Sequence, residues 1–592
     1  MSDYLFSSTP KEKGRLSNFI KNIYFESPPS CMEFHGEWGS LVISQGHYRG
    51  FLPFENEIHI CVVIGAPVLY FRNNDFLLGQ DSNIATQAIY ERWATQNKMD
   101  WVNDLSGPFT ILLINKKTSL ITAVTDLMGF IPVYSCLNQG EVYLGTHVDA
   151  LAKATGENGS YDSVSLADFI LTDVVTFPYT VYSALRQEVP GSELDFSVGH
   201  KKQTRTYWLP IENNPYNNID EAADALRHGI KRYIDTVTEK MPRLAQFISA
   251  GEDSRALSGL LPPTKPRDAY IFLDHMNREG KIAKKVASAY DAKFHVGYRD
   301  SLHYLDIVPE ASTLVGLGHQ YSHAHSLGFD KEFKLSDYDA VFGGYLADSL
   351  LKGAYVPKLR GSGRFPFLPD IVVNRSPIMA CFRKSGMPIK EDLKKEIEAR
   401  KKEHFDWIKE LRPNSVNEWF MLYPASMRIT IPNFYSTRRL FKSYEPFLSH
   451  EIVKGAAKIP INWKLNRKVF HRVMRPYLKK SQWIFHADGR LPYYPWWFNA
   501  PIQAYIWLTR QLKKRMGARE RNQGPWGDWK TVFSSDKWRT QIEELNETKE
   551  IKKLFKDGVL LSEITTATNG QQVNLMQTLW QLNYSRYNHK CK

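Results

Sequence analysis

The sequence has few cysteines, and they show no pairing pattern. The five cysteines among 592 residues are scattered, with no C-x-x-C spacing: Cys31, Cys61, Cys136, Cys381 and Cys591. This scarcity argues against a zinc site and against a disulfide scaffold, and it is typical of a reducing compartment. We therefore expect a cytoplasmic protein.

Targeting and membrane-spanning segments are also missing from the sequence. Residues 1–16 lack the apolar stretch of a signal peptide. Because no run of about 18 consecutive apolar residues is present, the sequence predicts no membrane span.

The composition is that of a globular protein with a basic excess. Hydrophobic residues make up 43%, and 76 Lys and Arg against 63 Asp and Glu give a net charge of +13. Domains of roughly 100–200 residues are usual, so we expect at least two. A basic excess favours anionic partners such as nucleotides or anionic substrates. The basic runs at 390–402 and 513–521 look like solvated helix faces, so no nucleic-acid partner is expected. A homodimer remains open.

The first 210 residues have the pattern of a layered α+β domain. Residues 1–30 are polar with a Ser-Pro-Pro-Ser break, and we interpret them as an N-terminal arm or loop. Short apolar runs at 58–64, 109–114 and 120–124 predict strands, and residues 83–96 have helical periodicity. The domain is expected to span residues 31–210.

From about residue 218 the pattern changes to alternating strands and helices. Helical periodicity at 220–237 is followed by the apolar run 244–248, a polar loop, the run 268–273, a helix over 279–290 and the run 293–296. This alternation predicts a parallel sheet covered by helices, in a second domain over residues 218–592. From about residue 376 the sequence is mostly helical and rich in tryptophan.

The loop Ser249-Ala250-Gly251-Glu252-Asp253-Ser254-Arg255 follows a predicted strand and opens a predicted helix. Small residues let the backbone approach an anion, and the helix start offers unpaired N–H groups and a positive dipole end. Asp253 would repel phosphate, which indicates a bridging Mg²⁺. The alternative is a strand-to-helix turn capped by Ser and Asp side chains.

Six strings along the chain resemble those of the asparagine synthetase family. The S-G-G-x-D-S loop of that family is similar to Ser249–Ser254, and five further strings match at 105–109, 126–134, 189–191 with 207–208, 341–348 and 444–450. The resemblance implies an Ntn-hydrolase-like N-terminal domain. It also implies an adenine nucleotide α-hydrolase-like (PP-loop) α/β synthetase domain with a helical extension.

The resemblance also implies an activity and a site. The family uses ATP and Mg²⁺ to adenylate a carboxylate, which an amine then attacks to form an amide. Asp253 and Asp348 would hold the metal. The nucleotide would be bound by a wider set of residues, namely Ser249, Gly251, Asp253, Ser254, Arg255 and Leu273. Arg255 could equally be an exposed helix residue.

Three departures from the family pattern define the expected subtype. The catalytic Cys that starts the family's glutaminases is missing, since the chain begins Met1-Ser2, and Ser2 precedes the first predicted strand by about 30 residues. A hydroxyl is a poorer nucleophile than a thiol at neutral pH, and Cys31 would need internal cleavage. We therefore expect a degenerate glutaminase domain and an amine from another source.

The other two departures concern the synthetase half. Tyr345 stands where the family has a glutamate, and it could act as a general base only if a neighbour lowered its pKa or took its proton. His486 stands where the family's late lysine is expected. Arg490 is the first candidate to supply that charge, because guanidinium suits phosphate oxygens. Other candidates are Lys464, Lys479 and Lys480.

Two further clusters leave alternatives open. His319, His323 and His325 would share one side of an extended strand. They could form a zinc site, but because no fourth ligand is apparent, hydrogen-bonded histidines near a pocket are favoured. Residues 496–498 (Trp-Trp-Phe) could line an acyl-substrate groove or pack into a helical core. The expected substrates are a small-molecule, sugar-acid or peptide carboxylate and an amine. The rival hypotheses are an ammonia-using asparagine synthetase and a non-catalytic ATP-binding scaffold.

Overall fold

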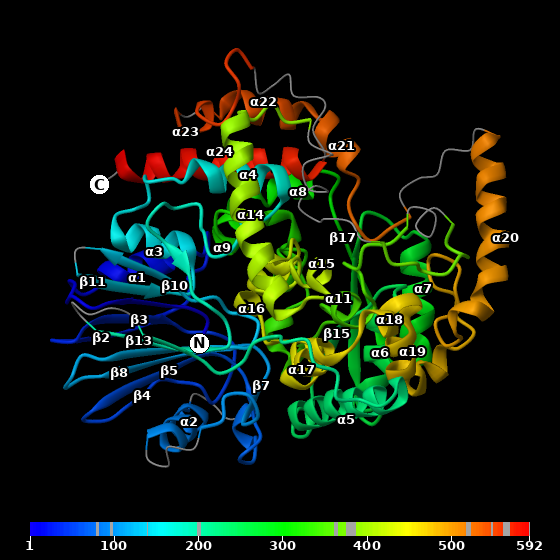
Figure 1. Ribbon diagram of the computed structural model, residues 1–592, viewed down its shortest axis with the longest axis horizontal. Helices are drawn as coiled ribbons and strands as arrows, with labels where there is room; N and C mark the ends of the chain where they lie inside the picture. Colours follow the sequence, from blue (N-terminus) through cyan, green and yellow to red (C-terminus); the bar gives the residue numbers. More distant parts are fainter. Residues whose placement is uncertain are drawn as a thin grey trace.

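The computed structural model describes residues 1–592 except 79–81, 95–98, 139, 198–202, 360–364, 374–385, 517–522, 546–548, 560–568 and 591–592, and only the backbone of 514 and 585–590. Cys381, Cys591 and residues 517–521 of the second basic run therefore lie outside the described residues. A β-sandwich formed by the first 210 residues packs against a mixed α/β domain, with further helices along the top and right edge in Figure 1.

The sandwich consists of two antiparallel sheets of six strands each. The first has the order β12-β10-β11-β1-β3-β2 and the second β14-β13-β9-β8-β5-β4. The first sheet contains β1 (Tyr4–Ser7), β2 (Cys31–Gly36), β3 (Gly39–Ser44), β10 (Tyr134–Asn138), β11 (Glu141–Gly145) and β12 (Arg186–Gln187). The second contains β4 (Phe54–Glu55), β5 (His59–Gly65), β8 (Phe109–Asn115), β9 (Ile121–Thr125), β13 (Ser192–Phe196) and β14 (Gln203–Thr206).

Short apolar runs form the centre of this sandwich. The strands predicted at 58–64, 109–114 and 120–124 are β5, β8 and β9. Strand β8 pairs with β5 on one side and with β9 on the other, and nearly all of the three strands' side chains are buried. The helix predicted at 83–96 is α2 (Ile84–Ala94). These predictions are confirmed. The remaining elements are the pair β6 (Val68–Leu69) and β7 (Leu105–Ser106) and the helices α1 (Arg15–Lys21), α3 (Val148–Thr155) and α4 (Ser163–Thr172).

The interpretation of residues 1–30 as an arm or loop is wrong. Strand β1 lies inside the first sheet, paired antiparallel with β11 on one side and β3 on the other. Its Tyr4, Leu5 and Phe6 are buried. Four residues between serines give too short a hydrophobic pattern to indicate a strand, and the pairing partners that bury it come from distant parts of the chain.

The second domain is built on a five-stranded parallel sheet of order β17-β16-β15-β18-β19. Its strands are β15 (Leu244–Phe247), β16 (Arg267–Leu273), β17 (Lys293–Tyr298), β18 (Ala340–Phe342) and β19 (Ser443–Tyr444). The helices that precede and connect the first strands are α5 (Ile219–Thr238), α6 (Glu252–Leu260) and α7 (Arg278–Ala289). The predicted alternation of strands and helices in a parallel sheet is confirmed.

Helices extend this domain beyond the sheet. Short ones connect the strands: α8 (His303–Asp306), α9 (Val308–Val315), α10 (Phe329–Glu332), α11 (Ala347–Leu351) and α15 (Val416–Trp419). The others are α14 (Glu391–Leu411), α16 (Ile431–Leu440), α17 (His450–Lys458), α18 (Ile461–Lys464), α19 (Lys468–Met474), α20 (Trp496–Arg515), α21 (Trp529–Ser534), α22 (Asp536–Glu544), α23 (Lys549–Lys552) and α24 (Asn569–Lys590). None of the helices in the described parts of the chain is both long enough and apolar enough to cross a bilayer. Lys401, in a basic run expected to be solvated, is buried on α14 at 3.0 Å from Asp168.

A buried charge cluster joins the start of the chain to the second domain. Asp3 is fully buried and accepts hydrogen bonds from Arg438 at 3.0 Å and from Arg439 at 2.7 and 2.8 Å, both on α16. Burial alone would raise the pKa of Asp3, but the two guanidinium groups hold it below its ordinary value. The first strand of the sandwich is therefore fixed to the α/β domain by charge-assisted hydrogen bonds.

Replacing Asp3 by asparagine is expected to lower the free energy of unfolding by about 3–5 kcal/mol, because two buried guanidinium groups lose their counter-charge. The pKa of Asp3 is depressed in the folded state. The difference between wild type and Asp3→Asn should therefore be complete above about pH 4 and shrink as the pH falls below that value. Urea unfolding at several pH values measures this difference.

The matched control is Asp235→Asn on the exposed face of α5, where Asp235 pairs with Lys231. It should change the unfolding free energy by less than about 1 kcal/mol. An Asp3→Asn protein as stable as this control would contradict the stabilising role of the cluster.

Candidate functional site

The loop between β15 and α6 forms a rigid turn at the carboxyl edge of the parallel sheet. Ser249 Oγ lies 2.9 Å from Ser254 Oγ and accepts the Gly251 N–H at 3.0 Å, while the Ala250 N–H donates to Glu279 at 2.7 Å. Gly251 is the N-cap of α6 and has no side-chain cap. The first N–H groups of the nine-residue helix α6 are therefore free of the Ser or Asp cap that would close an anion site.

A second loop packs directly on this turn. It follows β18, which is the neighbour of β15 on the side opposite β16. A Cβ added at Gly344 would come 3.3 Å from Asp253 Cβ, and one at Gly343 would collide with Glu445 at 2.0 Å. Two strands whose connections run to opposite sides of a parallel sheet mark the point where ligands usually bind, beyond the strand ends.

Three carboxylates gather where the two loops meet. Glu252 and Asp253 occupy the first turn of α6, and Asp348 lies near the start of α11. The pKa of Asp253 is raised to about 6, mainly by burial and also by the negative charges of Glu252 and Asp348, against the opposing effect of Lys352. The fold thus brings Asp253 and Asp348, 95 positions apart in the sequence, within electrostatic reach of each other.

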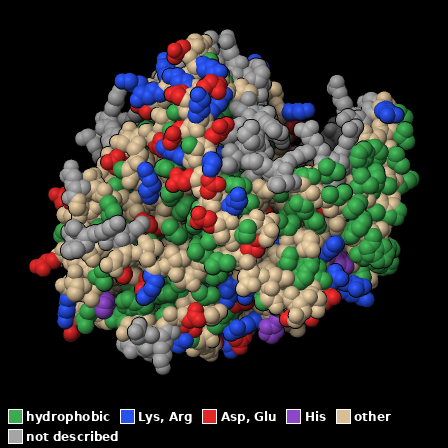
Figure 2. All heavy atoms as spheres, viewed as in Figure 1, with side chains coloured by type: hydrophobic (Ala, Val, Ile, Leu, Met, Phe, Trp, Pro, Cys, Tyr) green, Lys and Arg blue, Asp and Glu red, His purple; other side chains and the backbone are tan. Residues whose placement is uncertain are grey.

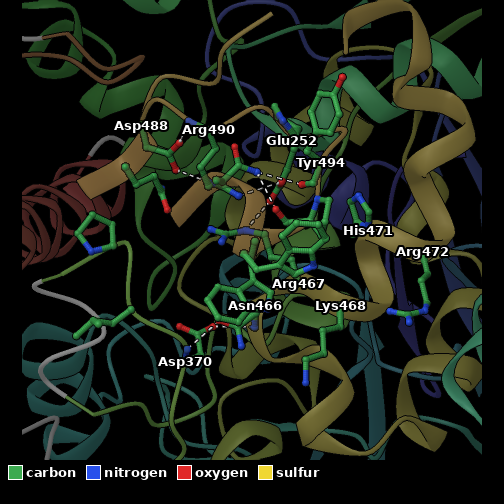
Figure 3. Close-up of a pocket in the computed structure, with 18 of the residues that line it drawn as sticks. Glu252, Asp370, Asn466, Arg467, Lys468, His471, Arg472, Asp488, Arg490 and Tyr494 are labelled. Atoms are coloured by element: carbon green, nitrogen blue, oxygen red, sulfur yellow. Dashed lines mark hydrogen bonds and ion pairs between the residues drawn. The ribbon is translucent and has the colours of Figure 1, made fainter. Parts of the chain in front are cut away.

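Three cations surround these carboxylates. Lys352 Nζ lies 2.7 Å from Asp253 and 3.3 Å from Glu252, Arg467 lies 2.7 Å from Glu252, and Arg490 lies 3.3 Å from Glu252. Arg490 is held by Asp488 at 2.7 Å. Figure 3 shows Arg467 and Arg490 pointing toward Glu252. In the described part of the chain no group of three or more His, Cys, Asp or Glu side chains is arranged to hold a metal ion.

The predicted Arg490 therefore faces the loop, and the other candidate lysines do not. Lys464 is fully buried in an ion pair with Glu418 at 2.9 Å, and Lys480 pairs with Asp291 at the surface. Lys479 is exposed, 5.8 Å from the ring centre of Tyr493. Sequence reasoning missed Lys352 and Arg467. For Lys352 a signal existed, because it follows Asp348 by four residues, one helical turn.

A cavity of about 610 Å³ opens on the side of Glu252. Its wall combines basic groups with aromatic rings: Lys358, Arg467, Lys468, Arg472 and Arg490 with Trp463, Tyr494, Trp496 and Trp497. Figure 3 labels Arg467, Lys468, Arg472, Arg490 and Tyr494 among them. Of the two interpretations of residues 496–498, packing into a helical core is wrong for Trp497, which is 64% exposed. Trp496 and Trp497 line the cavity, because the helix that they start stands away from the sheet.

A second cavity of about 210 Å³ lies on the other side of the turn and is mostly apolar. It contains Ser249, Gly343, Gly344 and Tyr345 from the two loops. Its aromatic walls come from Phe247, Tyr270, Phe272 and Trp526, and the polar side chains among them include Arg299, His325, Asn433 and Glu445. Its aromatic walls suit a flat heterocycle, which can stack on the rings.

Tyr345 reaches this second cavity as a neutral phenol. Its hydroxyl lies 3.1 Å from Thr430 Oγ1, and the Arg428 guanidinium lies 5.6 Å from its ring centre. Burial raises the pKa of Tyr345 despite Arg428. The lowered pKa that would allow it to act as a base is not present, so Tyr345 is placed to donate or accept a hydrogen bond.

Three other predicted site residues are placed differently from expectation. Arg255 is neither at a cavity nor exposed: it is fully buried and donates to the carbonyls of Ala250, Ile484 and Phe485. Leu273 is fully buried and packs among apolar residues behind the sheet. His486 lies 2.9 Å from Asp488, which in turn holds Arg490. Arg255 and His486 therefore hold the segment 484–490 in place and position Arg490 without facing either cavity themselves.

The three histidines near residue 320 do not form an extended strand. Tyr321–His323 is a short 3-10 helix, so the alternate spacing does not put the rings on one side. His323 Nδ1 lies 3.4 Å from His325 Nε2, whereas His319 packs on the ring of Tyr435. Burial lowers the pKa of all three, to about 4 for His319 and His323. They are neutral buried side chains, and His325 lines the second cavity.

The prediction that Ser2 lies about 30 residues before the first strand is wrong, because β1 starts at Tyr4. Ser2 lies two residues before the first residue of β1 and is buried, with its backbone N–H donating to the Ser44 carbonyl at 3.2 Å. Its hydroxyl is 2.6 Å from where a Cβ on Gly46 would lie. Cys31 is the first residue of β2, half-buried, and burial raises the pKa of its thiol.

The comparisons with known proteins identify the sandwich. Residues 72–208 match the family model described as a glutamine amidotransferase domain. The chain therefore contains an antiparallel, class II (Ntn-like) amidotransferase-type sandwich, followed by a parallel-sheet α/β domain with a helical extension. The expected Ntn-hydrolase-like fold of the N-terminal domain is confirmed at this level.

Two solved structures are also matched. One is the allosteric regulatory enzyme of purine biosynthesis, with 8% identity over 50% of this chain and 80% of that chain. The other is glutamine phosphoribosylpyrophosphate amidotransferase from B. subtilis complexed with ADP and GMP, with 7% identity over 52% and 92%. Both have a TM-score of 0.25. A sequence comparison with curated proteins gives no match.

Replacing Lys352 by methionine should test the charge balance at the loops. The variant keeps the length of the side chain but leaves Glu252 and Asp253 without their ammonium partner. Since the pKa of Asp253 is about 6, the lost attraction should lower the melting temperature more at pH 8, where Asp253 is ionised, than at pH 5, where it is largely protonated. Differential scanning fluorimetry measures both.

Lys231→Met on exposed α5 is the control and should shift the melting temperature little at either pH. Equal losses at pH 5 and pH 8 for Lys352→Met would show that Lys352 does not compensate a charge on Asp253.

Proposed function

We propose that this protein is an ATP-dependent carbon–nitrogen ligase that adenylates a substrate carboxylate and passes the acyl group to an amine. One observation supports this most: the uncapped start of α6, with Asp253, Asp348 and three cations around it, lies at the strand-order reversal of a parallel sheet. The amidotransferase-type domain beside it is consistent with amide chemistry.

The residues present fit a magnesium nucleotide. Asp253 and Asp348 would hold Mg²⁺, because the raised pKa of Asp253, to which the nearby Asp348 charge contributes, marks a place where added positive charge is stabilising. The phosphates would lie at Ser249, Gly251, Ser254 and the first N–H groups of α6. When bound, Mg²⁺ and ATP supply the leaving group that turns a carboxylate into an acylating agent.

The side chains of this chain have separate tasks in the proposal. Arg490, Arg467 and Lys352 offset negative charge on the departing pyrophosphate. The 210 Å³ cavity would take the nucleotide base between the rings of Phe272 and Trp526. Tyr345, as a neutral phenol held by Thr430, orients the amine.

The wall of the 610 Å³ cavity bears on the identity of the carboxylate substrate. Several Lys and Arg side chains among tryptophans, of which Trp497 is exposed, suit an acidic ligand with a flat or ring-shaped body, such as a sugar acid or a peptide carboxylate. One observation favours the alternative of a non-catalytic ATP-binding scaffold: Lys352 already pairs with Asp253, the expected metal ligand.

The amine is proposed to come from outside the sandwich. The chain offers Ser2 rather than a cysteine before β1, and a hydroxyl is a weaker nucleophile than a thiolate. Ser2 is also buried, with its carbonyl hydrogen-bonded by Arg438. These residues support a structural role for the sandwich, fixed to α16 through Asp3.

Carboxylate-dependent exchange of pyrophosphate into ATP tests the proposed activity. Wild-type protein with Mg²⁺ and a panel of sugar acids, amino acids and peptides should show exchange with at least one acid. Asp253→Asn should reduce it by about 100-fold or more, because metal and phosphate contacts are lost together. The exposed control Asp235→Asn should keep wild-type activity.

Wild-type protein that binds ATP but exchanges nothing across the panel would favour the scaffold. Exchange that survives in Asp253→Asn would contradict the assignment of Asp253 to the metal.

Glutamine hydrolysis should be absent. Ammonia release from glutamine by the wild-type protein is expected to equal that of Ser2→Ala, at the level of buffer alone. Hydrolysis that Ser2→Ala abolishes would show a working glutaminase domain, whatever the outcome of the exchange assay.

A further inference from the structure

Helix α20 carries a long apolar face that no other described element covers. Trp497, Tyr505, Leu508 and Leu512 are 64%, 69%, 55% and 57% exposed, and Met516, directly after the helix, is 77% exposed. At 3.6 residues per turn these positions fall within about 100° of the helix circumference. Figure 2 shows apolar side chains gathered over this helix at the right edge of the molecule. A continuous exposed apolar surface of this kind marks an interaction site.

The opposite face of α20 is what attaches the helix to the protein. The Trp507 ring contacts those of Phe365 and Phe367 at 5.1 and 5.8 Å, and a Cβ on Gly489 would come 2.2 Å from Ile506. Asn499 accepts from the Leu491 N–H and donates to its carbonyl. Because these contacts fix the helix, the exposed face is not needed for folding.

The charges of α20 indicate the chemistry of the partner. Residues 496–515 contain four Lys and Arg, all in the last six positions, and no Asp or Glu. Lys513 and Arg515 are exposed beside the apolar face. The aromatic residues Trp497, Phe498 and Tyr505 lie on the exposed side with them. Aromatic and aliphatic groups beside clustered cations complement a surface that is both apolar and anionic.

We propose that α20 docks this protein on the interface of an anionic lipid bilayer, with its apolar face among the upper acyl chains and its cations at the headgroups. The helix lies in the surface rather than crossing it, because four cations in six residues cannot enter the hydrocarbon core cheaply. A second copy of the chain is a poorer occupant, since its identical face repeats the positive charge and supplies no acid.

The 610 Å³ cavity lies at the foot of this helix. Trp496, Trp497, Asn499 and Gln503 of α20 belong to its wall. Docking of α20 would therefore bring the mouth of the cavity close to the lipid surface. The docking itself does not depend on the proposed ligase activity.

Flotation with vesicles tests the docking. Full-length protein should float with phosphatidylcholine vesicles that contain phosphatidylglycerol, and much less with phosphatidylcholine alone or at high salt. The double variant Leu508→Glu, Leu512→Glu should reduce the partition coefficient by about tenfold or more, because two leucines leave the apolar face and two carboxylates oppose the headgroups.

The control is Leu137→Glu, Ile211→Glu, which makes the same change of charge at two residues that are each 58% exposed in the N-terminal half of the chain. It should bind like wild type, and the melting temperatures of both variants should match wild type. Equal loss in both variants, or no flotation of wild type, would overturn the proposal. A wild-type dimer in the absence of lipid that only the α20 variant dissociates would also overturn it and make the face a subunit interface.

Discussion

Crowding of like charges at the first turn of α6 is the constraint on which the site depends. Glu252, Asp253 and Asp348 are held close together by two loops whose glycines leave no room for side chains, and burial raises the pKa of Asp253, so that its ionisation is costly. Lys352, Arg467 and Arg490 come from three separate segments to offset that cost. In the protein without ligand these three cations balance the carboxylate charges. A bound metal ion could replace part of that positive charge, and the cations would then be available to phosphates.

Buried charged side chains also fix the segments around the site. Arg255 binds the backbone at Ala250, Ile484 and Phe485, so the α6 loop and the segment leading to Arg490 are held as one unit. On the other side, Asp3 attaches the sandwich to α16, which carries Arg438 and Arg439. The amidotransferase-type domain is thereby fixed to the α/β domain rather than joined by a flexible linker.

Elements with a local hydrophobic pattern could be predicted from the sequence. Elements and contacts that depend on distant parts of the chain could not. Strands β5, β8, β9, β15 and β16 follow from apolar runs of five to seven residues, whereas the four-residue β1 is buried only because β3 and β11 flank it. The loop 249–254 and Asp348 were found from their strings, and the fold places them together. Arg467 could not be found, because its contact with Glu252 spans more than 200 residues and leaves no local pattern. Arg255 was placed wrongly because sequence spacing does not show which face of α6 is covered.

The central claim is that Asp253 and Asp348 share a divalent ion with a nucleotide at the start of α6. A crystal structure with ATP and Mn²⁺, read by anomalous scattering, tests it most directly. We expect one Mn²⁺ peak between the two carboxylates, phosphate density at Gly251, and Lys352 displaced from Asp253. A nucleotide bound elsewhere, or a peak absent here while the Lys352–Asp253 pair stays closed, would contradict the account.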